Sequence, residues 1–228
     1  CKIISPDIVV ITAIGDQHLE RLKSRKMLAM TLFEAMQYSN KEAKFILTKD
    51  TVTDFETLGI DIFKLYEKER FIIIENNENM QYEGKEIIAK ELSEVNKYNA
   101  QFALKVCEIL SIPQEYVVDE MKKLKIPDRR SQEITRDEFM TIDNSYNISL
   151  NTAKAGVLDG LRKAKESSKK LVVITGGIPE VGDENRQANF EYGQFLFKNN
   201  IERLIVLKTS LAVEILNGYS FNNKDAEN

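Results

Sequence analysis

Short apolar runs alternate along this chain with segments whose apolar residues recur at helical spacing, and this alternation most constrains the fold. The predicted strands are residues 8–14, 44–48, 71–75, 139–142, 171–175 and 204–207. Apart from 139–142, each is rich in Val, Ile, Leu or Phe with little alternation, as is typical of strands covered on both faces. Amphipathic patterns lie between them, most clearly near 100–107, 151–165 and 185–199. The alternation predicts an α/β fold with mostly parallel sheets flanked by helices.

A domain boundary is predicted near residues 125–131. Pro127 ends the helical pattern that precedes it, and a new cycle of strands and helices follows. We therefore predict two α/β units, residues 1–126 and 127–228. Because the first residue is Cys and a strand pattern begins at residue 8, we also expect the chain to be a fragment of a longer protein.

Composition narrows the classes of partner. Lys and Arg number 32 and Asp and Glu number 36, a net charge of −4, which argues against a nucleic-acid-binding face. No apolar run approaches the length of a transmembrane helix, so we expect no membrane insertion. The only cysteines, Cys1 and Cys107, form neither a metal-ligand spacing nor a disulfide framework, so a reducing cytoplasm is the expected compartment. The sequence gives no indication of oligomeric state.

His18, the only histidine, follows the first predicted strand by a few residues. Open α/β sheets place ligands at the carboxyl ends of parallel strands, where an imidazole could ligate a metal or move a proton. From its position alone, a surface histidine in a turn is the simpler interpretation.

A second polar segment, Asp143–Asn147, follows the strand predicted at 139–142. Its carboxylate, aromatic ring and amides suit a ribose diol and an adenine ring, although a turn with a helix N-cap is the simpler alternative. Arg129 and Arg130, at the predicted boundary, could bind phosphate or be solvated charges.

A glycine-rich segment, residues 175–182, follows a third predicted strand. Glycines there could let the backbone approach a ligand, although a simple tight turn is the preferred interpretation of this segment alone. The chain contains no P-loop of the form G-x-x-x-x-G-K-[ST].

Taken in order, these segments resemble the Mur ligase family. Residues 6–20 are similar to the family's P-x-hydrophobic-T-x-I-G-x-x-H-L-E segment, and Asn96–Ala100 to N-x-x-N-A. Pro127–Arg129 is similar to P-x-R, Asp143–Asn147 to D-D-S-Y-N, and Thr175–Gly182 to T-P-G-x-x-E-L-G. The nearest branch adds D-alanyl-D-alanine to a UDP-muramoyl tripeptide. The resemblance implies that 1–126 is the later part of a central ATP-binding domain and that 127–228 is most of a Rossmann-like C-terminal domain.

The resemblance also implies a reaction in peptidoglycan precursor synthesis. ATP phosphorylates the carboxylate of a UDP-muramoyl peptide, and the amine of an amino acid or dipeptide attacks the acyl phosphate, with Mg²⁺ stabilising the developing charge. No catalytic residue is assigned. The implied binding residues are His18 for Mg²⁺, Asn99 for adenine, Arg129 for the phosphates or ribose, Asp143 for the ribose hydroxyls, and Tyr146 and Asn147 beside the adenosine.

Two departures from the family pattern favour an alternative. The family carries a carbamylated lysine that helps to position magnesium, and Leu32 occupies its place here. Thr48 stands where the family's N-x-D-D segment has asparagine. The alternative is a degenerate Mur-like protein that binds a nucleotide without forming an amide bond. A nucleotide-binding regulator of another α/β family is a third possibility.

Overall fold

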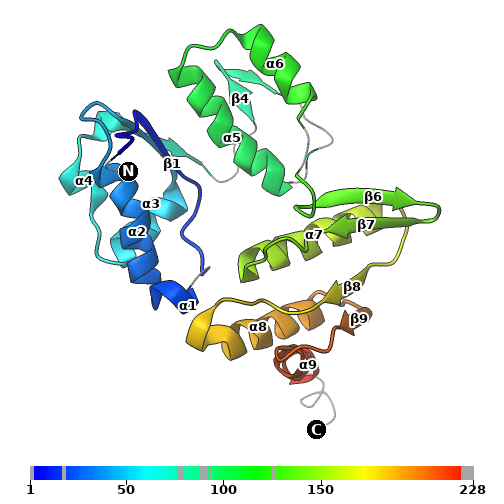
Figure 1. The fold of residues 1–228 in the computed structure, drawn as a ribbon. Helices are drawn as coiled ribbons and strands as arrows, with labels where there is room; N and C mark the ends of the chain where they lie inside the picture. Colours follow the sequence, from blue (N-terminus) through cyan, green and yellow to red (C-terminus); the bar gives the residue numbers. More distant parts are fainter. Residues whose placement is uncertain are drawn as a thin grey trace. The chain divides into compact units, whose positions relative to one another are not determined.

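The computed structural model describes residues 3–16, 19–75, 80–87, 92, 94–124 and 127–221. The chain divides into two compact units, each built from helices and strands (Figure 1). Unit 1 comprises Cys1–Ile14 and Ser24–Lys125, and unit 2 comprises Gly15–Lys23 and Ile126–Asn228. The predicted fold class is confirmed, because each unit contains parallel strands flanked by helices.

Unit 1 is built on a parallel sheet of β1 (Ile8–Ile11), β2 (Lys44–Thr48) and β3 (Phe71–Ile74), with β2 in the middle. Ile8 pairs with Lys44 and Phe45 pairs with Phe71. Three successive residues of β2, Phe45, Ile46 and Leu47, have no exposed surface. This burial explains why β2 reads as a continuous apolar run, since both of its faces are covered.

Helices cover both faces of this sheet. α2 (Arg25–Gln37) and α3 (Lys49–Thr57) pack on one face, and Phe33 and Phe55 lie in that core. α5 (Glu94–Ile109) packs on the other face, where Phe102 contacts Ile46 and Ile74. The sheet is therefore the middle layer of a three-layer arrangement.

The rest of unit 1 is smaller. A helical turn α4 (Ile62–Leu65) and a 3-10 turn η1 (Lys68–Arg70) lead into β3. A short hairpin of β4 (Gln81–Tyr82) and β5 (Lys85–Glu86) packs with α5 and α6 (Gln114–Lys122) around the buried Tyr82. The Tyr82 hydroxyl donates to the Ile112 carbonyl, so the polar end of this buried ring is satisfied.

Unit 2 begins with an antiparallel hairpin and continues as a βαβ unit. The hairpin pairs β6 (Gln132–Arg136) with β7 (Phe139–Asp143), and α7 (Leu150–Glu166) follows it. The strands β8 (Val172–Thr175) and β9 (Arg203–Val206) are parallel and are joined through η2 (Gly182–Glu184) and α8 (Asn185–Lys198). α9 (Ala212–Phe221) completes the unit. β6, the partner of β7, was not among the predicted strands.

α8 and α9 pack with their backbones in contact. A Cβ atom at Gly193 would lie 2.1 Å from the Ile215 carbonyl oxygen, and one at Gly218 would lie 2.0 Å from the Phe190 carbonyl oxygen. Each helix therefore presents a glycine to the other, and no side chain fits at either position.

The segment Gly15–Lys23 belongs to unit 2, although it follows β1 directly in the sequence. It contains α1 (Leu19–Leu22), and Leu19 lies in the core of unit 2 with only 6% of its surface exposed. Gly182, with φ +62°, approaches this segment, so that a Cβ there would lie 3.3 Å from the Glu20 nitrogen. The predicted unit 1–126 included residues 15–23, whereas the structure groups them with unit 2, in whose core Leu19 is buried.

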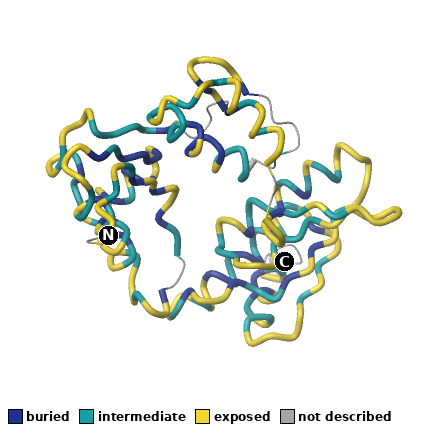
Figure 2. Tube along the Cα trace, turned by 45° about the horizontal axis from the view of Figure 1, so that its top comes forward, coloured by how far each residue is buried: buried dark blue, intermediate teal, exposed yellow. Residues whose placement is uncertain are grey.

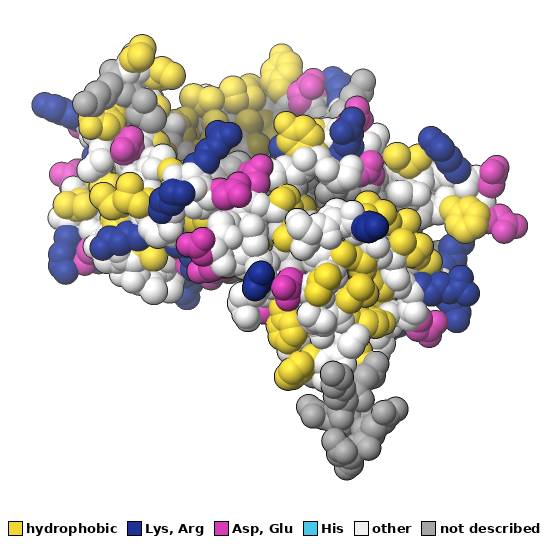
Figure 3. All heavy atoms as spheres, turned by 60° about the horizontal axis from the view of Figure 1, so that its bottom comes forward, with side chains coloured by type: hydrophobic (Ala, Val, Ile, Leu, Met, Phe, Trp, Pro, Cys, Tyr) yellow, Lys and Arg dark blue, Asp and Glu magenta, His cyan; other side chains and the backbone are white. Residues whose placement is uncertain are grey.

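Burial alternates along most helices, as the amphipathic patterns predict (Figure 2). On the exposed face of β8 and β9, Val172, Ile174 and Ile205 remain 42%, 64% and 50% exposed. On the face drawn in Figure 3, apolar side chains lie among interspersed basic and acidic ones. Every helix in the described ranges is too short or too polar to cross a bilayer.

Candidate functional site

The base of the β6–β7 hairpin brings together the two polar segments of unit 2. Asp143, the last residue of β7, pairs in register with Gln132, the first residue of β6. The Gln132 side chain accepts from the Arg129 nitrogen at 3.1 Å and donates to an Asp128 carboxylate oxygen at 3.0 Å. The Tyr146 nitrogen donates to the Arg129 carbonyl at 3.3 Å. Residues 127–132 and 143–146 therefore form one local structure.

Tyr146 offers an exposed aromatic face in this structure. Tyr146 is 61% exposed, and the Arg130 guanidinium lies 4.6 Å from the centroid of its ring. Such cation–π stacking restricts both side chains while leaving much of the ring open to solvent. The pair could therefore stack against a flat aromatic ligand.

Asp143 is held as a carboxylate. Hydrogen bonds from Ser145, including one from its nitrogen at 2.9 Å, together with the nearby charge of Arg129, lower the pKa of Asp143 below its usual value. An ionised carboxylate that is only partly buried can accept hydrogen bonds from a diol such as that of ribose.

The helix cap after this segment is made by other residues. The Ser149 side chain accepts from the Thr152 nitrogen at 3.3 Å, and the Thr152 hydroxyl accepts from the Ser149 nitrogen at 2.8 Å. This capping box begins α7, so Asn147, which is exposed, does not cap the helix. The turn interpretation holds in part, since Asp143 accepts from Ser145 two residues later.

Asn99, predicted to contact adenine, lies on α5 in unit 1 and is exposed. Its neighbour Tyr98 donates through its hydroxyl to the Thr12 carbonyl at 2.7 Å, just past β1. Burial raises the pKa of Tyr98, and a hydrogen bond with Thr48 opposes that shift. Tyr98 thus links the carboxyl ends of β1 and β2, beside Asn99.

Thr48 has a structural role in place of the family's asparagine. It is 1% exposed, and its hydroxyl accepts from the Thr51 nitrogen at 3.1 Å, which caps α3. The Thr48 side chain therefore makes two contacts within unit 1, the cap of α3 and the hydrogen bond with Tyr98.

Leu32 takes the place that the resemblance gives to the carbamylated lysine. Leu32 is partly buried and packs against the apolar core between the sheet and α2, so its position is part of that packing. Within the described ranges, no three His, Cys, Asp or Glu side chains converge as a metal site would require. His18 lies outside the described residues, so its prediction as a magnesium ligand remains untested.

The glycine-rich segment 175–182 includes a turn held by hydrogen bonds to Asn189. Asn189, which has no exposed surface, accepts from the Ile178 nitrogen at 2.8 Å and donates to the Ile178 carbonyl at 3.0 Å and the Asn185 carbonyl at 2.8 Å. Gly177 has φ +96°, which favours glycine. Asn189 therefore holds this turn in place from α8.

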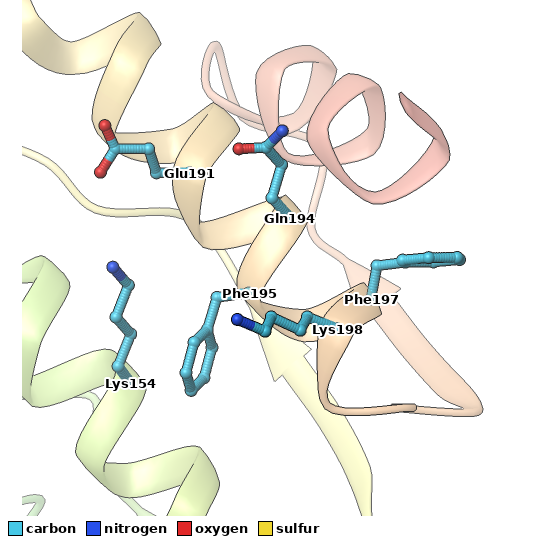
Figure 4. A pocket seen from close by; sticks show the side chains of 6 residues that line it. All are labelled: Lys154, Glu191, Gln194, Phe195, Phe197 and Lys198. Carbon is cyan, nitrogen blue, oxygen red and sulfur yellow. The ribbon is translucent and has the colours of Figure 1, made fainter. Parts of the chain in front are cut away.

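A shallow hollow of about 500 Å³ lies between α7 and α8. Figure 4 shows Lys154 of α7 facing Phe195 of α8, and the Lys154 ammonium is 5.7 Å from the centroid of that ring. The other lining residues are Glu191, Gln194, Phe197 and Lys198. None of these residues is a predicted nucleotide contact, so the base of the hairpin remains the candidate site.

Comparison with known proteins identifies similar ligases. No family model matches the chain. The chain is 24% identical over 213 residues to the UDP-N-acetylmuramoyl-tripeptide–D-alanyl-D-alanine ligase of Bacillus subtilis, covering 89% of this chain and 46% of that protein. A crystal structure of MurF from Acinetobacter baumannii superposes with a TM-score of 0.71 at 18% identity, covering 95% of this chain and 50% of MurF. The chain has the fold of half a MurF ligase.

A second MurF structure gives the same result. MurF from Thermotoga maritima, solved in complex with ADP, superposes with a TM-score of 0.70 at 18% identity and covers 94% of this chain. The chain spans about half the length of the MurF proteins that it matches. The similarity to MurF therefore extends to both sequence and fold.

Proposed function

We propose that the natural protein carrying this chain is an ATP-dependent ligase that joins an amino acid or D-alanyl-D-alanine to a UDP-muramoyl peptide. The proposal concerns the natural protein because the chain spans about half the length of its MurF relatives. The observation that carries it is the clustering of Arg129, Asp143 and Tyr146 at the base of one hairpin. Similarity to MurF supports the reaction class.

In the proposed reaction, the terminal phosphoryl group of ATP passes to the peptide carboxylate, giving ADP and an acyl phosphate. The incoming amine attacks the acyl carbon and loses a proton, and the C–O bond to phosphate breaks, leaving an amide and inorganic phosphate. Asp143 accepts hydrogen bonds from the ribose hydroxyls, and Arg129 approaches the phosphates or the ribose. Tyr146 and Asn147 lie beside the adenosine. Asn99 contacts the adenine. Precise holding of the nucleotide is how such residues accelerate phosphoryl transfer.

A coupled assay tests this proposal. The natural protein is incubated with ATP, magnesium, UDP-muramoyl tripeptide and D-alanyl-D-alanine, and ADP and the amide product are measured together. We expect ADP release to require both the UDP-muramoyl tripeptide and D-alanyl-D-alanine. Ligase activity is contradicted if no amide product forms at any protein concentration, either with D-alanyl-D-alanine or with single amino acids.

Leu32 favours a second candidate function, nucleotide binding without ligation. Leucine has no amine to carbamylate, and Leu32 packs against the apolar core of unit 1. The Leu32→Lys variant distinguishes the two functions, because a lysine can extend its amine to solvent from a partly buried position. If the natural protein binds ATP without product, and Leu32→Lys forms product in the presence of bicarbonate, the chain is a degenerate member of the ligase class.

A further inference from the structure

Two segments of unit 2 are tied together by a single side-chain oxygen. The Asn144 Oδ1 accepts from the Ser131 nitrogen at 2.8 Å and from the Ser131 hydroxyl at 3.2 Å. Ser131 is only 8% exposed, and its φ of +58° is a conformation that L residues rarely adopt. Because the serine is buried and its backbone is strained, these hydrogen bonds are needed to hold it.

The other side of the Asn144 amide faces Gly156 of α7. A Cβ atom at Gly156 would lie 2.5 Å from the Asn144 Nδ2, closer than carbon and nitrogen can approach. Glycine at position 156 therefore leaves the space that the amide occupies. Asn144 is thus enclosed between Ser131 and the first half of α7.

The residues tied by this amide are neighbours of the predicted nucleotide contacts. Asn144 directly follows Asp143, and Ser131 lies two residues after Arg129. The hydrogen bond from the Tyr146 nitrogen to the Arg129 carbonyl joins the same two segments, but it is a single bond at 3.3 Å. The buried Ser131–Asn144 contact lies next to the β6–β7 pairing of Gln132 with Asp143, and together they set how far apart the segments lie.

We propose that Asn144 is a positioning residue, which sets the separation of Arg129 and Asp143 for a nucleoside phosphate bound at the base of the hairpin. This inference rests on the proposed function. Asn144 touches no ligand in this proposal and acts only through Ser131 and Asp143. Its effect on nucleotide affinity comes from preorganisation, since a misplaced pair of contacts must be reordered when the ligand binds.

Three variants separate positioning from simple folding. Asn144→Asp keeps an oxygen that accepts both Ser131 hydrogen bonds, whereas Asn144→Leu has a similar size and accepts neither. Gly156→Ala displaces the amide while leaving Asn144 and Ser131 unchanged. A matched control is Asn199→Ala, which removes a side-chain hydrogen bond to the Phe195 carbonyl at 2.8 Å elsewhere in unit 2.

The experiment measures ADP affinity of the natural protein and its variants by calorimetry, together with hydrogen exchange of the Ser131 amide. We expect Asn144→Leu and Gly156→Ala to weaken ADP binding by about tenfold or more and to speed exchange at Ser131. Asn144→Asp and Asn199→Ala should bind ADP with an affinity within about threefold of that of the unaltered protein, because both variants keep the hydrogen bonds between Ser131 and residue 144.

The outcomes are distinct. If the unaltered protein binds no ADP, the proposed function fails, and the inference fails with it. If the unaltered protein binds ADP and Asn144→Leu binds it equally well, the positioning role is refuted while the nucleotide site stands. Equal losses in Asn144→Asp and Asn144→Leu would also refute it, since the aspartate keeps both hydrogen bonds from Ser131. Should Asn144→Leu fail to fold, Gly156→Ala decides between these outcomes.

Discussion

Replacing Gly193 by alanine tests the backbone contact between α8 and α9. The added Cβ would lie 2.1 Å from the Ile215 carbonyl oxygen and 2.8 Å from the Tyr219 nitrogen, against a normal carbon–oxygen contact of about 3.3 Å. One helix must therefore shift by about 1 Å, which places the cost near the upper end of the roughly 1–3 kcal/mol for overpacking. The higher helix propensity of alanine relative to glycine offsets up to about 1 kcal/mol of this cost. We expect a net loss of about 2 kcal/mol in unit 2.

Gly160→Ala is the matched control, because Gly160 is also a helical glycine of unit 2. Its added Cβ meets side-chain ends, at 3.1 Å from the Leu171 Cδ1 and 3.9 Å from the Ile142 Cδ1, and the closer Leu171 side chain can rotate away. We expect this variant to be unchanged or more stable by up to about 1 kcal/mol.

Native-state hydrogen exchange suits this comparison because the chain has two units, so a single unfolding transition is not assured. A loss of about 2 kcal/mol corresponds to roughly thirtyfold faster exchange of the slowest α8 and α9 amides. Exchange in Gly193→Ala as slow as in the unaltered chain would refute the backbone contact.

Three further predictions concern single side chains of unit 2. Burial raises the pKa of Tyr192 to about 12, so unit 2 should lose about 3 kcal/mol as pH rises from near 10 through 12, where the unfolded phenol ionises first. Circular dichroism during alkaline titration checks this, and Tyr192→Phe should lack that loss. Asn189→Leu should cost about 3 kcal/mol or more in urea unfolding, because it leaves the Ile178 nitrogen and carbonyl buried without their partner. A cost near zero would contradict that network. The lowered pKa of Asp143 means that its stabilisation persists above the ordinary carboxyl value and is lost only as pH falls through the lower, folded value. An NMR titration of the Asp143 carboxyl should show its midpoint below 3.8, and a midpoint above that value would contradict the Ser145 contacts.

Local sequence patterns located most of the secondary structure. β2 was predictable because its strand is covered on both faces, which requires an unbroken apolar run at Phe45, Ile46 and Leu47. α7 and α8 were predictable because one face of each helix is apolar at helical spacing. β6 was missed because its residues are polar and mostly exposed, and only pairing with β7 makes it a strand.

The candidate site was predictable in part. Asp143 and Tyr146 drew attention because they follow a predicted strand, and the resemblance to the Mur ligase family assigned them to the nucleotide. The sequence could not show that Gln132 pairs with Asp143, or that Asn144 ties Ser131 to the same place. Those contacts join residues 11 and 13 positions apart, through a hairpin register that composition does not encode.

The amino-acid sequence by itself determined the α/β class, the alternation of strands and helices, and the residue types available at each strand end. Those properties follow from side-chain chemistry and from periodicities of two and 3.6 residues, which act over a few positions. Only the tertiary structure decided that Leu19 is buried in unit 2 and that Leu32 packs into the core of unit 1. It also decided that Gly193 and Gly218 bring two helix backbones together. These outcomes depend on which apolar faces meet across long separations in the chain. The faces that pack together most closely determine the result.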